Sequence, residues 1–193
     1  MRELGPRLKH SGTTILESDI MKIVDLKKHI RDVPDFPQEG IIFKDISTLI
    51  KHKVAFKKSI DVLASKFKKS RVQYVVGVEA RGFIFGSALA YKLGAGFIPV
   101  RKKGKLPYKT KSVTYQLEYG TDTLEIHEDA IAPNARVLIV DDLLATGGTV
   151  KAVTELLRGQ KAKIVGVAFI VELKFLNGKD KLKDFPIYSV IQY

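Results

Sequence analysis

Two adjacent carboxylates at the end of an apolar run are the residues whose types and spacing first suggest chemistry. The stretch Val137–Val150 reads VLIVDDLLATGGTV, so an apolar run leads into Asp141 and Asp142 and then into a segment of small residues. Carboxylate oxygens accept hydrogen bonds from a vicinal diol, and each can also serve a divalent metal. We therefore expect Asp141 and Asp142 to bind the hydroxyl groups of a sugar.

The segment that follows the acids predicts a phosphate site, made by Ala145, Thr146, Gly147, Gly148 and Thr149. It lies between an expected strand and an expected helix, so the free N–H groups of the helix point at the ligand, and the helix dipole adds positive potential. No Walker or dinucleotide glycine pattern is present. A phosphate cradle beside a diol acceptor describes a ribose 5-phosphate, whereas an isolated acidic pair would more often cap a helix or face solvent.

Alternating buried strands and helices must position these residues. The patterns predict helices at Ser18–Ile30, Phe56–Phe67, Gly82–Gly94 and Thr149–Gly159, and buried strands at Val72–Val78, Gly96–Val100, Arg136–Val140 and Lys163–Leu173. They also predict a hairpin of Val113–Gly120 with Asp122–Glu128. Two loops are expected: Val33–Ser47, which leads into a short apolar stretch, and Lys102–Ser112, which should be exposed and mobile. This alternation is typical of an α/β fold with a mainly parallel sheet flanked by helices. In such sheets, ligands bind beyond the carboxyl ends of the strands.

Composition bounds the class of protein. The 193 residues suit one domain, and 45% hydrophobic with 28% charged residues is the balance of a globular chain. We expect no signal peptide and no membrane span, and the lack of cysteine favours the interior of a cell. The formal charge of +12 attracts polyanions, which include nucleic acid, an anionic membrane and a phosphorylated small substrate. A lysine-rich solvated surface would also account for much of it.

Val137–Val150 resembles the phosphoribosyl diphosphate motif of type I phosphoribosyltransferases. Other segments resemble the adenine-using branch of that family in the same order: Asp35–Ser47, Glu79–Gly86, Arg101–Pro107, Tyr115–Gly120 and the final SVIQY. The resemblance runs from about Val33 to Tyr193. It implies one phosphoribosyltransferase domain at 33–193, with a small N-terminal hood at about 33–50 and a flexible β-hairpin loop. Residues 1–32 are then an N-terminal extension with the first helix, and Met21 is an alternative start.

The resemblance also implies the reaction and the partners. The 5-phosphoribosyl group of phosphoribosyl diphosphate (PRPP) would be transferred to adenine, giving AMP and pyrophosphate in purine salvage. Mg²⁺ would be the cofactor, carried mainly by the substrate and not by direct protein ligands. The family further suggests a homodimer in the cytoplasm, without a membrane or nucleic-acid partner.

Roles for individual residues follow from the same resemblance. Arg81, which is also a catalytic candidate, would bind pyrophosphate together with Arg101, Lys102 and Lys105. The family's non-proline cis peptide is expected between Glu79 and Ala80.

The adenine and its proton are assigned in the same way. Glu118 would manage a proton near N7 of the base, although a lone Glu on an alternating strand usually faces solvent. Phe43 can stack on adenine while the backbone of Ile42 and Lys44 reads its edge, or Ile42 and Phe43 can be core. Many relatives have Arg where Lys44 stands, so the backbone role is the stronger expectation for this residue.

Three alternatives stay open. One is a phosphoribosyltransferase for hypoxanthine, guanine or xanthine, although DDLLATGGT together with FPQEGIIFKD favours adenine. Another is a nucleic-acid-binding regulator that keeps the phosphoribosyl site as a sensor, for which the residues before Val33 are few. The third is RNA binding by the basic surface as a side activity.

Overall fold

The computed structural model describes residues 26–116 and 120–193. The chain divides into two compact units, Met1–Phe56 and Lys57–Tyr193. The predicted helix at Ser18–Ile30 therefore lies mostly outside the described residues. Within them, the backbone N–H groups of His29 and Ile30 donate to the carbonyls of Leu26 and Lys27 at 3.0 Å, and β1 begins at the next residue.

The first unit contains a two-stranded antiparallel sheet where the sequence predicted a loop. Strands β1 (Arg31–Pro34) and β2 (Ile42–Asp45) pair in register and are followed by the short helix α2 (Ser47–Lys51). Ion pairs cross the two strands: Arg31 lies 2.5 Å from Asp45, and Lys44 lies 2.7 Å from Asp32. The residues typical of loops hid this hairpin: Pro34 is the last residue of β1, and Pro37 and Gly40 lie in the turn between the strands.

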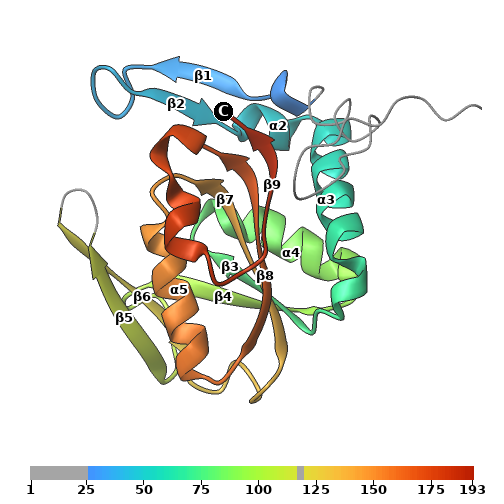
Figure 1. Ribbon diagram of the computed structural model, residues 1–193, viewed down its shortest axis with the longest axis vertical. Helices are drawn as coiled ribbons and strands as arrows, with labels where there is room; N and C mark the ends of the chain where they lie inside the picture. Colours follow the sequence, from blue (N-terminus) through green and yellow to red (C-terminus); the bar gives the residue numbers. More distant parts are fainter. Residues whose placement is uncertain (1–25, 117–119) are drawn as a thin grey trace, which may run out of the picture. The chain divides into compact units, whose positions relative to one another are not determined.

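The second unit is built on a seven-stranded sheet with the order β5-β6-β4-β3-β7-β8-β9 (Figure 1). Strands β4, β3, β7, β8 and β9 are parallel, and the hairpin β5–β6 joins β4 in antiparallel fashion. The bounds are β3 Tyr74–Val78, β4 Gly96–Lys102, β5 Thr110–Gln116, β6 Thr121–His127, β7 Arg136–Leu144, β8 Lys163–Glu172 and β9 Ile187–Gln192. The predicted α/β class with a mainly parallel sheet is confirmed.

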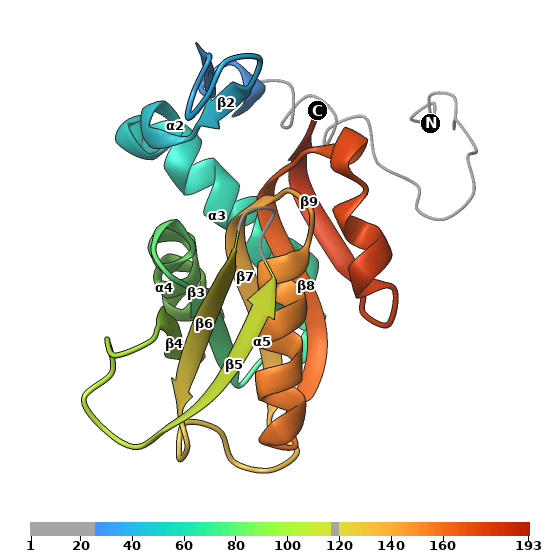
Figure 2. The same ribbon diagram turned by 90° about the vertical axis from the view of Figure 1, so that its left-hand side faces the viewer.

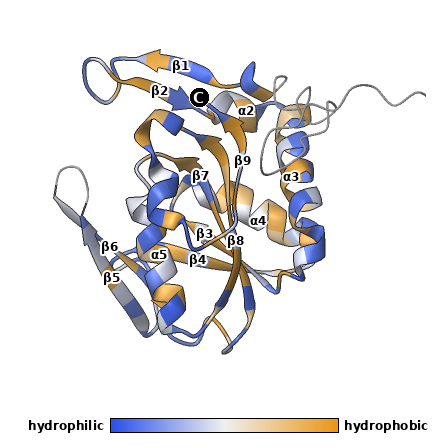
Figure 3. Ribbon diagram, viewed as in Figure 1, coloured by the Kyte–Doolittle hydropathy of each residue, from blue (hydrophilic) through white to orange (hydrophobic). Residues whose placement is uncertain are grey.

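Helices cover both faces of this sheet (Figures 1 and 2). Helix α4 (Arg81–Leu93) packs on β3, β4 and β7, on the face that the end of α3 (Lys53–Phe67) also covers. Helix α5 (Gly148–Gly159) lies on the other face and packs against the β5–β6 hairpin at the edge of the sheet. Strand β3 and the Val137–Val140 part of β7 are apolar (Figure 3), as expected of strands that are buried on both faces.

Short 3₁₀ helices fill the connections, namely η1 (Lys68–Ser70), η2 (Lys174–Leu176) and η3 (Gly178–Leu182). The sequence patterns did not predict η2, η3 or the edge strand β9. No helix in the described part of the chain is long and apolar enough to cross a bilayer.

Two of the element boundaries that differ from the prediction matter for function. Strand β7 continues through both acids to Leu144, because β8 keeps pairing with it as far as Glu172. Strand β5 begins at Thr110, inside the segment predicted as a loop. The predicted hairpin is confirmed in the residues that the structure describes, and the φ of +85° at Gly120 suits its turn.

Candidate active site

The acidic pair is buried near the carboxyl end of β7. Asp141 is 8% exposed and Asp142 is 5% exposed. The backbone N–H of Asp142 donates to Asp141 Oδ1 at 2.8 Å, and Arg81 Nε lies 2.7 Å from Asp142 Oδ2. Arg81 is the first residue of α4, so the strand and the helix present opposite charges to each other.

Burial has a direct electrostatic consequence for Asp141. Loss of solvent, and then the neighbouring Asp142 carboxylate, raise the pKa of Asp141 well above its ordinary value. Helix α4 approaches this carboxyl closely at Gly82, where a Cβ atom would lie 2.8 Å from Asp141 Oδ1. The pair is thus enclosed by backbone and by a cation, and a ligand that brings positive charge would favour its ionised form.

The predicted phosphate segment forms the turn between β7 and α5. Helix α5 begins at Gly148, and Gly147 precedes it with a φ of +77°. The helix has no side-chain cap and no acidic residue in its first turn, so its N–H groups and its dipole are available to an anion. Thr146 is exposed, while the other four residues of the segment are partly or fully buried.

The backbone at the start of η3 packs against this turn. A Cβ atom added to Gly147 would collide with the carbonyl oxygen of Gly178, and one added to Gly178 would collide with the carbonyl oxygen of Ala145. The two backbones therefore touch. Leu173 N–H also donates to Leu144 O at 2.9 Å, which fixes the residues just before the turn.

The expected cis peptide between Glu79 and Ala80 is present. The Glu79 carboxylate receives hydrogen bonds from Arg101, at 3.2 and 3.3 Å, and from Lys102 N–H at 2.8 Å. Partial burial raises the pKa of Glu79, but these bonds outweigh it and leave the pKa below its ordinary value. Arg101, on β4, is thereby tied to the turn that leads from β3 into Arg81.

Lys102 is the last residue of β4, and Lys105 lies in the turn that follows. Lys102 Nζ lies 3.0 Å from Asp122 Oδ2 on β6, and this hydrogen bond raises the pKa of Lys102. Arg101 donates to Lys105 O at 2.9 Å, and Lys105 N–H donates to Lys102 O at 3.2 Å. The segment is mostly exposed, as predicted, and these contacts hold the backbone of Lys105 against the end of β4.

The predicted adenine residues lie in the first unit. Ile42 is 56% exposed, and Phe43 is half-buried, with its ring 5.2 Å from that of Phe36 in an edge-on arrangement. Among the described residues, β2 pairs with β1 alone, so alternate backbone groups of β2 point away from its partner strand. The Lys44 side chain is 13% exposed and paired with Asp32.

The structure thus brings together, within the second unit, the acids, the phosphate turn, Arg81 and the basic segment after β4. Glu118 lies outside the described residues. Sequence reasoning missed the partners Glu79 and Asp122, as well as Gly178. Glu79 could have been found from its position two residues before Arg81, but no local signal marks Gly178, because its contact comes from a distant part of the chain.

Comparisons with known proteins identify the family. The model of the phosphoribosyl transferase domain matches residues 47–192. A relative named adenine phosphoribosyltransferase from Pelobacter propionicus is 57% identical over 169 residues, which cover 88% of this chain and 98% of the relative. The crystal structure of adenine phosphoribosyltransferase from Thermoanaerobacter pseudethanolicus is 48% identical, with a TM-score of 0.86. The match covers 89% of this chain and 99% of that chain.

A more distant structure carries ligands. Adenine phosphoribosyltransferase from Saccharomyces cerevisiae, solved with an imino-altritol bisphosphate and adenine, is 39% identical, with a TM-score of 0.85 and coverage of 89% and 99%. These matches cover most of this chain and nearly all of each relative, so they confirm the resemblance inferred from the sequence. This chain belongs to the type I phosphoribosyltransferases, in the family of the adenine phosphoribosyltransferases.

Proposed function

We propose that this protein transfers the 5-phosphoribosyl group of PRPP to adenine, with release of pyrophosphate and formation of AMP for purine salvage. The observation that carries the proposal is the connection between β7 and α5. Two buried carboxylates near the end of β7 are followed, after a short turn, by a helix N-terminus without a side-chain cap. The identity of 57% to a protein named for this activity supports the choice of adenine.

In this proposal, Asp141 and Asp142 accept hydrogen bonds from the ribose hydroxyls. The backbone of Ala145–Thr149 and the two threonine hydroxyls bind the 5′-phosphate. The anomeric carbon gains positive character as the bond to pyrophosphate breaks, so a nearby carboxylate charge stabilises the transition state. Arg81 holds Asp142 in place across 2.7 Å and is close enough to the acids to meet the departing pyrophosphate.

Pyrophosphate leaves as a polyanion that Arg81, Arg101, Lys102 and Lys105 would bind. Each of the first three already touches a carboxylate, so the product must compete with Asp142, Glu79 and Asp122 for these cations. We expect that this competition keeps pyrophosphate from binding too tightly to leave.

Mg²⁺ is part of the proposal as an ion that arrives with PRPP. Among the described residues, no group of three or more His, Asp or Glu side chains could hold a metal ion. Asp142 already faces Arg81, and Asp141 has a raised pKa, so this donor set suits an ion held mainly by substrate oxygens. When bound, Mg²⁺ would neutralise charge on the leaving pyrophosphate.

A test of the base uses PRPP and Mg²⁺ with adenine, hypoxanthine or guanine in separate reactions that follow pyrophosphate release. We expect release with adenine alone. Release only with hypoxanthine or guanine would overturn the base assignment. Absence of release with all three, together with binding of PRPP, would favour the sensor.

The proton role of Glu118 has its own test. Glu118→Ala should lower kcat by about 10²-fold without weakening PRPP binding, because general acid–base help is typically worth that much. Glu128→Ala, an exposed Glu just past the end of β6, is the matched control and should be silent. An unchanged kcat in Glu118→Ala would remove Glu118 from the chemistry.

Further parts of the proposal concern the whole chain. We expect residues 33–193 to form the catalytic domain with a hood at about 33–50, in which Phe43 stacks on adenine and the backbone of Ile42 and Lys44 reads its edge. A version that begins at Met21 should keep full activity. We also expect a homodimer in the cytoplasm, which light scattering and cell fractionation would check.

A further inference from the structure

Strand β5 lies beside helix α5 for most of the length of both (Figures 1 and 2). The seven residues of β5 span about 23 Å and the twelve residues of α5 about 18 Å, so the two elements are similar in length. Alternate residues of a strand share one face. Lys111, Val113 and Tyr115 therefore point the same way.

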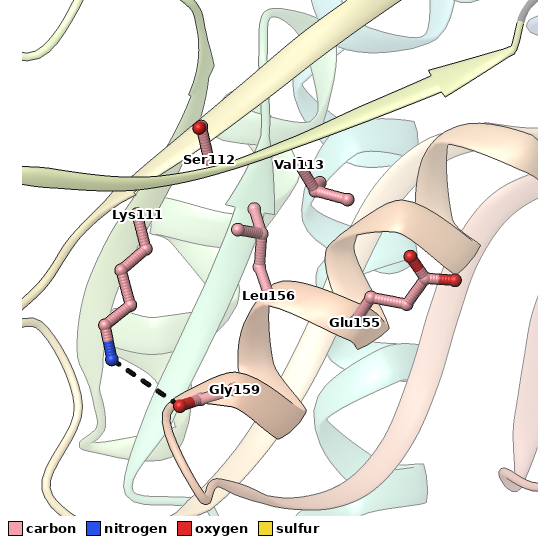
Figure 4. A pocket seen from close by; sticks show the side chains of 6 residues that line it. All are labelled: Lys111, Ser112, Val113, Glu155, Leu156 and Gly159. Atoms are coloured by element: carbon pink, nitrogen blue, oxygen red, sulfur yellow. Dashed lines mark hydrogen bonds between the residues drawn. The ribbon is translucent and has the colours of Figure 1, made fainter.

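Two contacts fix the first part of β5 against the end of α5. Lys111 Nζ donates to the carbonyl oxygen of Gly159 at 3.5 Å (Figure 4). Val113 and Leu156 face each other across a hollow of about 360 Å³ that is also lined by Glu155 (Figure 4). The strand therefore runs along the helix from its C-terminus toward its N-terminus.

The third residue of this face reaches the phosphate turn. Thr149 Oγ1, in the first turn of α5, donates to Tyr115 Oη at 3.4 Å. The neighbouring backbone is just as near, since a Cβ atom on Gly148 would lie 3.6 Å from the carbonyl oxygen of Gln116. Tyr115 thus stands at the same helix end to which the 5′-phosphate is assigned.

The hydroxyl group of Tyr115 has the chemistry of an anion ligand. An oxygen that accepts a hydrogen bond from Thr149 keeps its own O–H for donation. Burial, chiefly, raises the pKa of Tyr115, and the nearby Asp122 and Asp141 carboxylates act in the same direction. The phenol is therefore protonated at neutral pH and is a donor.

We propose that Tyr115 Oη is a further ligand of the 5′-phosphate, which it meets from the hairpin side while the turn after β7 meets it from the helix side. This rests on the proposed function. A phosphate bound in this way joins α5 to β5, the strand that leads into Glu118.

The test removes one oxygen atom. Tyr115→Phe keeps the ring, and Tyr108→Phe is the matched control, because Tyr108 is 55% exposed and precedes the same strand. Calorimetry would give the Kd of AMP and of adenosine for wild type and both variants. We expect Tyr115→Phe to weaken AMP about tenfold, as for loss of one hydrogen bond to a charged group, and to leave adenosine and Tm unchanged.

Each other outcome is decisive. An AMP affinity within twofold of wild type in Tyr115→Phe, or an equal loss for AMP and adenosine, would overturn the role of Tyr115. In either case, a wild-type preference for AMP over adenosine would leave the proposed function intact. If the wild-type protein itself bound AMP no more tightly than adenosine, the phosphate site and the proposed function would fail.

Discussion

The two sides of the candidate site are built in opposite ways. On the ribose-phosphate side, short side chains and backbone atoms are fixed by the sheet, by α5 and by the contact between Gly147 and Gly178. On the pyrophosphate side, long cationic side chains are held by carboxylates that a ligand can replace, such as Glu79 and Asp122. In the proposed assignment, the part of the substrate that stays would be bound by rigid backbone, whereas the part that leaves would be met by exchangeable ion pairs.

The largest expected effect comes from Asp142→Asn, which breaks the rigid side. This variant loses a charged acceptor for the ribose and the 2.7 Å partner of Arg81. We expect kcat/KM for PRPP to fall by about 10²–10³-fold, as for other preorganised electrostatic groups. Steady-state kinetics would measure it. Asp184→Asn removes an exposed partner of Arg158 and serves as control; a similar loss there would mean that the effect is not specific to the site.

Gly147→Ala should come next. Alanine is strained at a φ of +77°, and its Cβ would collide with Gly178 O. We expect a loss of about 2–4 kcal/mol in the free energy of unfolding, from the left-handed conformation and from overpacking, together with weaker PRPP binding. Urea titration would measure it. Gly159→Ala is the control, because its Cβ would meet nothing within 4 Å; equal losses in both variants would contradict the backbone contact.

A smaller effect concerns pH. The folded protein binds a proton at Asp141 more tightly than the unfolded chain does, so its free energy of unfolding falls as pH rises from about 4 through the raised pKa. Asp141→Asn removes this cost. In the ligand-free protein, we expect the variant to gain about 1 kcal/mol or more over wild type at pH 7.5 and little at pH 4. Chemical unfolding at both pH values decides, and a gain of equal size at both would show that burial of the Asp141 charge is not its cause.

The smallest expected effect concerns the exchangeable ion pairs on the pyrophosphate side. Asp122→Asn releases Lys102 from its 3.0 Å ion pair, so pyrophosphate no longer competes with that carboxylate. Since partly exposed ion pairs are worth about 0.2–1 kcal/mol, we expect pyrophosphate to inhibit two- to fivefold more strongly. Product-inhibition assays would show it. Asp129→Asn, an exposed acid beyond β6, is the control, and weaker inhibition in Asp122→Asn would reverse the interpretation.

Local signals explain what the sequence could predict. The buried strands, the hairpin, the acids and the glycine turn are each encoded by neighbouring residues, and the class of fold follows from their alternation. The hairpin at Arg31–Asp45 was missed because its turn residues masked its short strands. The extension of β7 to Leu144 and the contact of Gly178 with the phosphate turn depend on β8 and on η3, which no window around Asp141 contains.

The backbone contact between Gly147 and Gly178 has a consequence for engineering new sugar-phosphate specificity. The carbonyl of Gly178 excludes a side chain at Gly147, and the carbonyl of Ala145 excludes one at Gly178, so the two segments limit substitution in each other. A combinatorial library confined to Ala145–Thr149 would return glycine at its centre whatever ligand was selected. Diversity in loop shape would require simultaneous changes in length around Asn177, so that the two segments are redesigned as one unit.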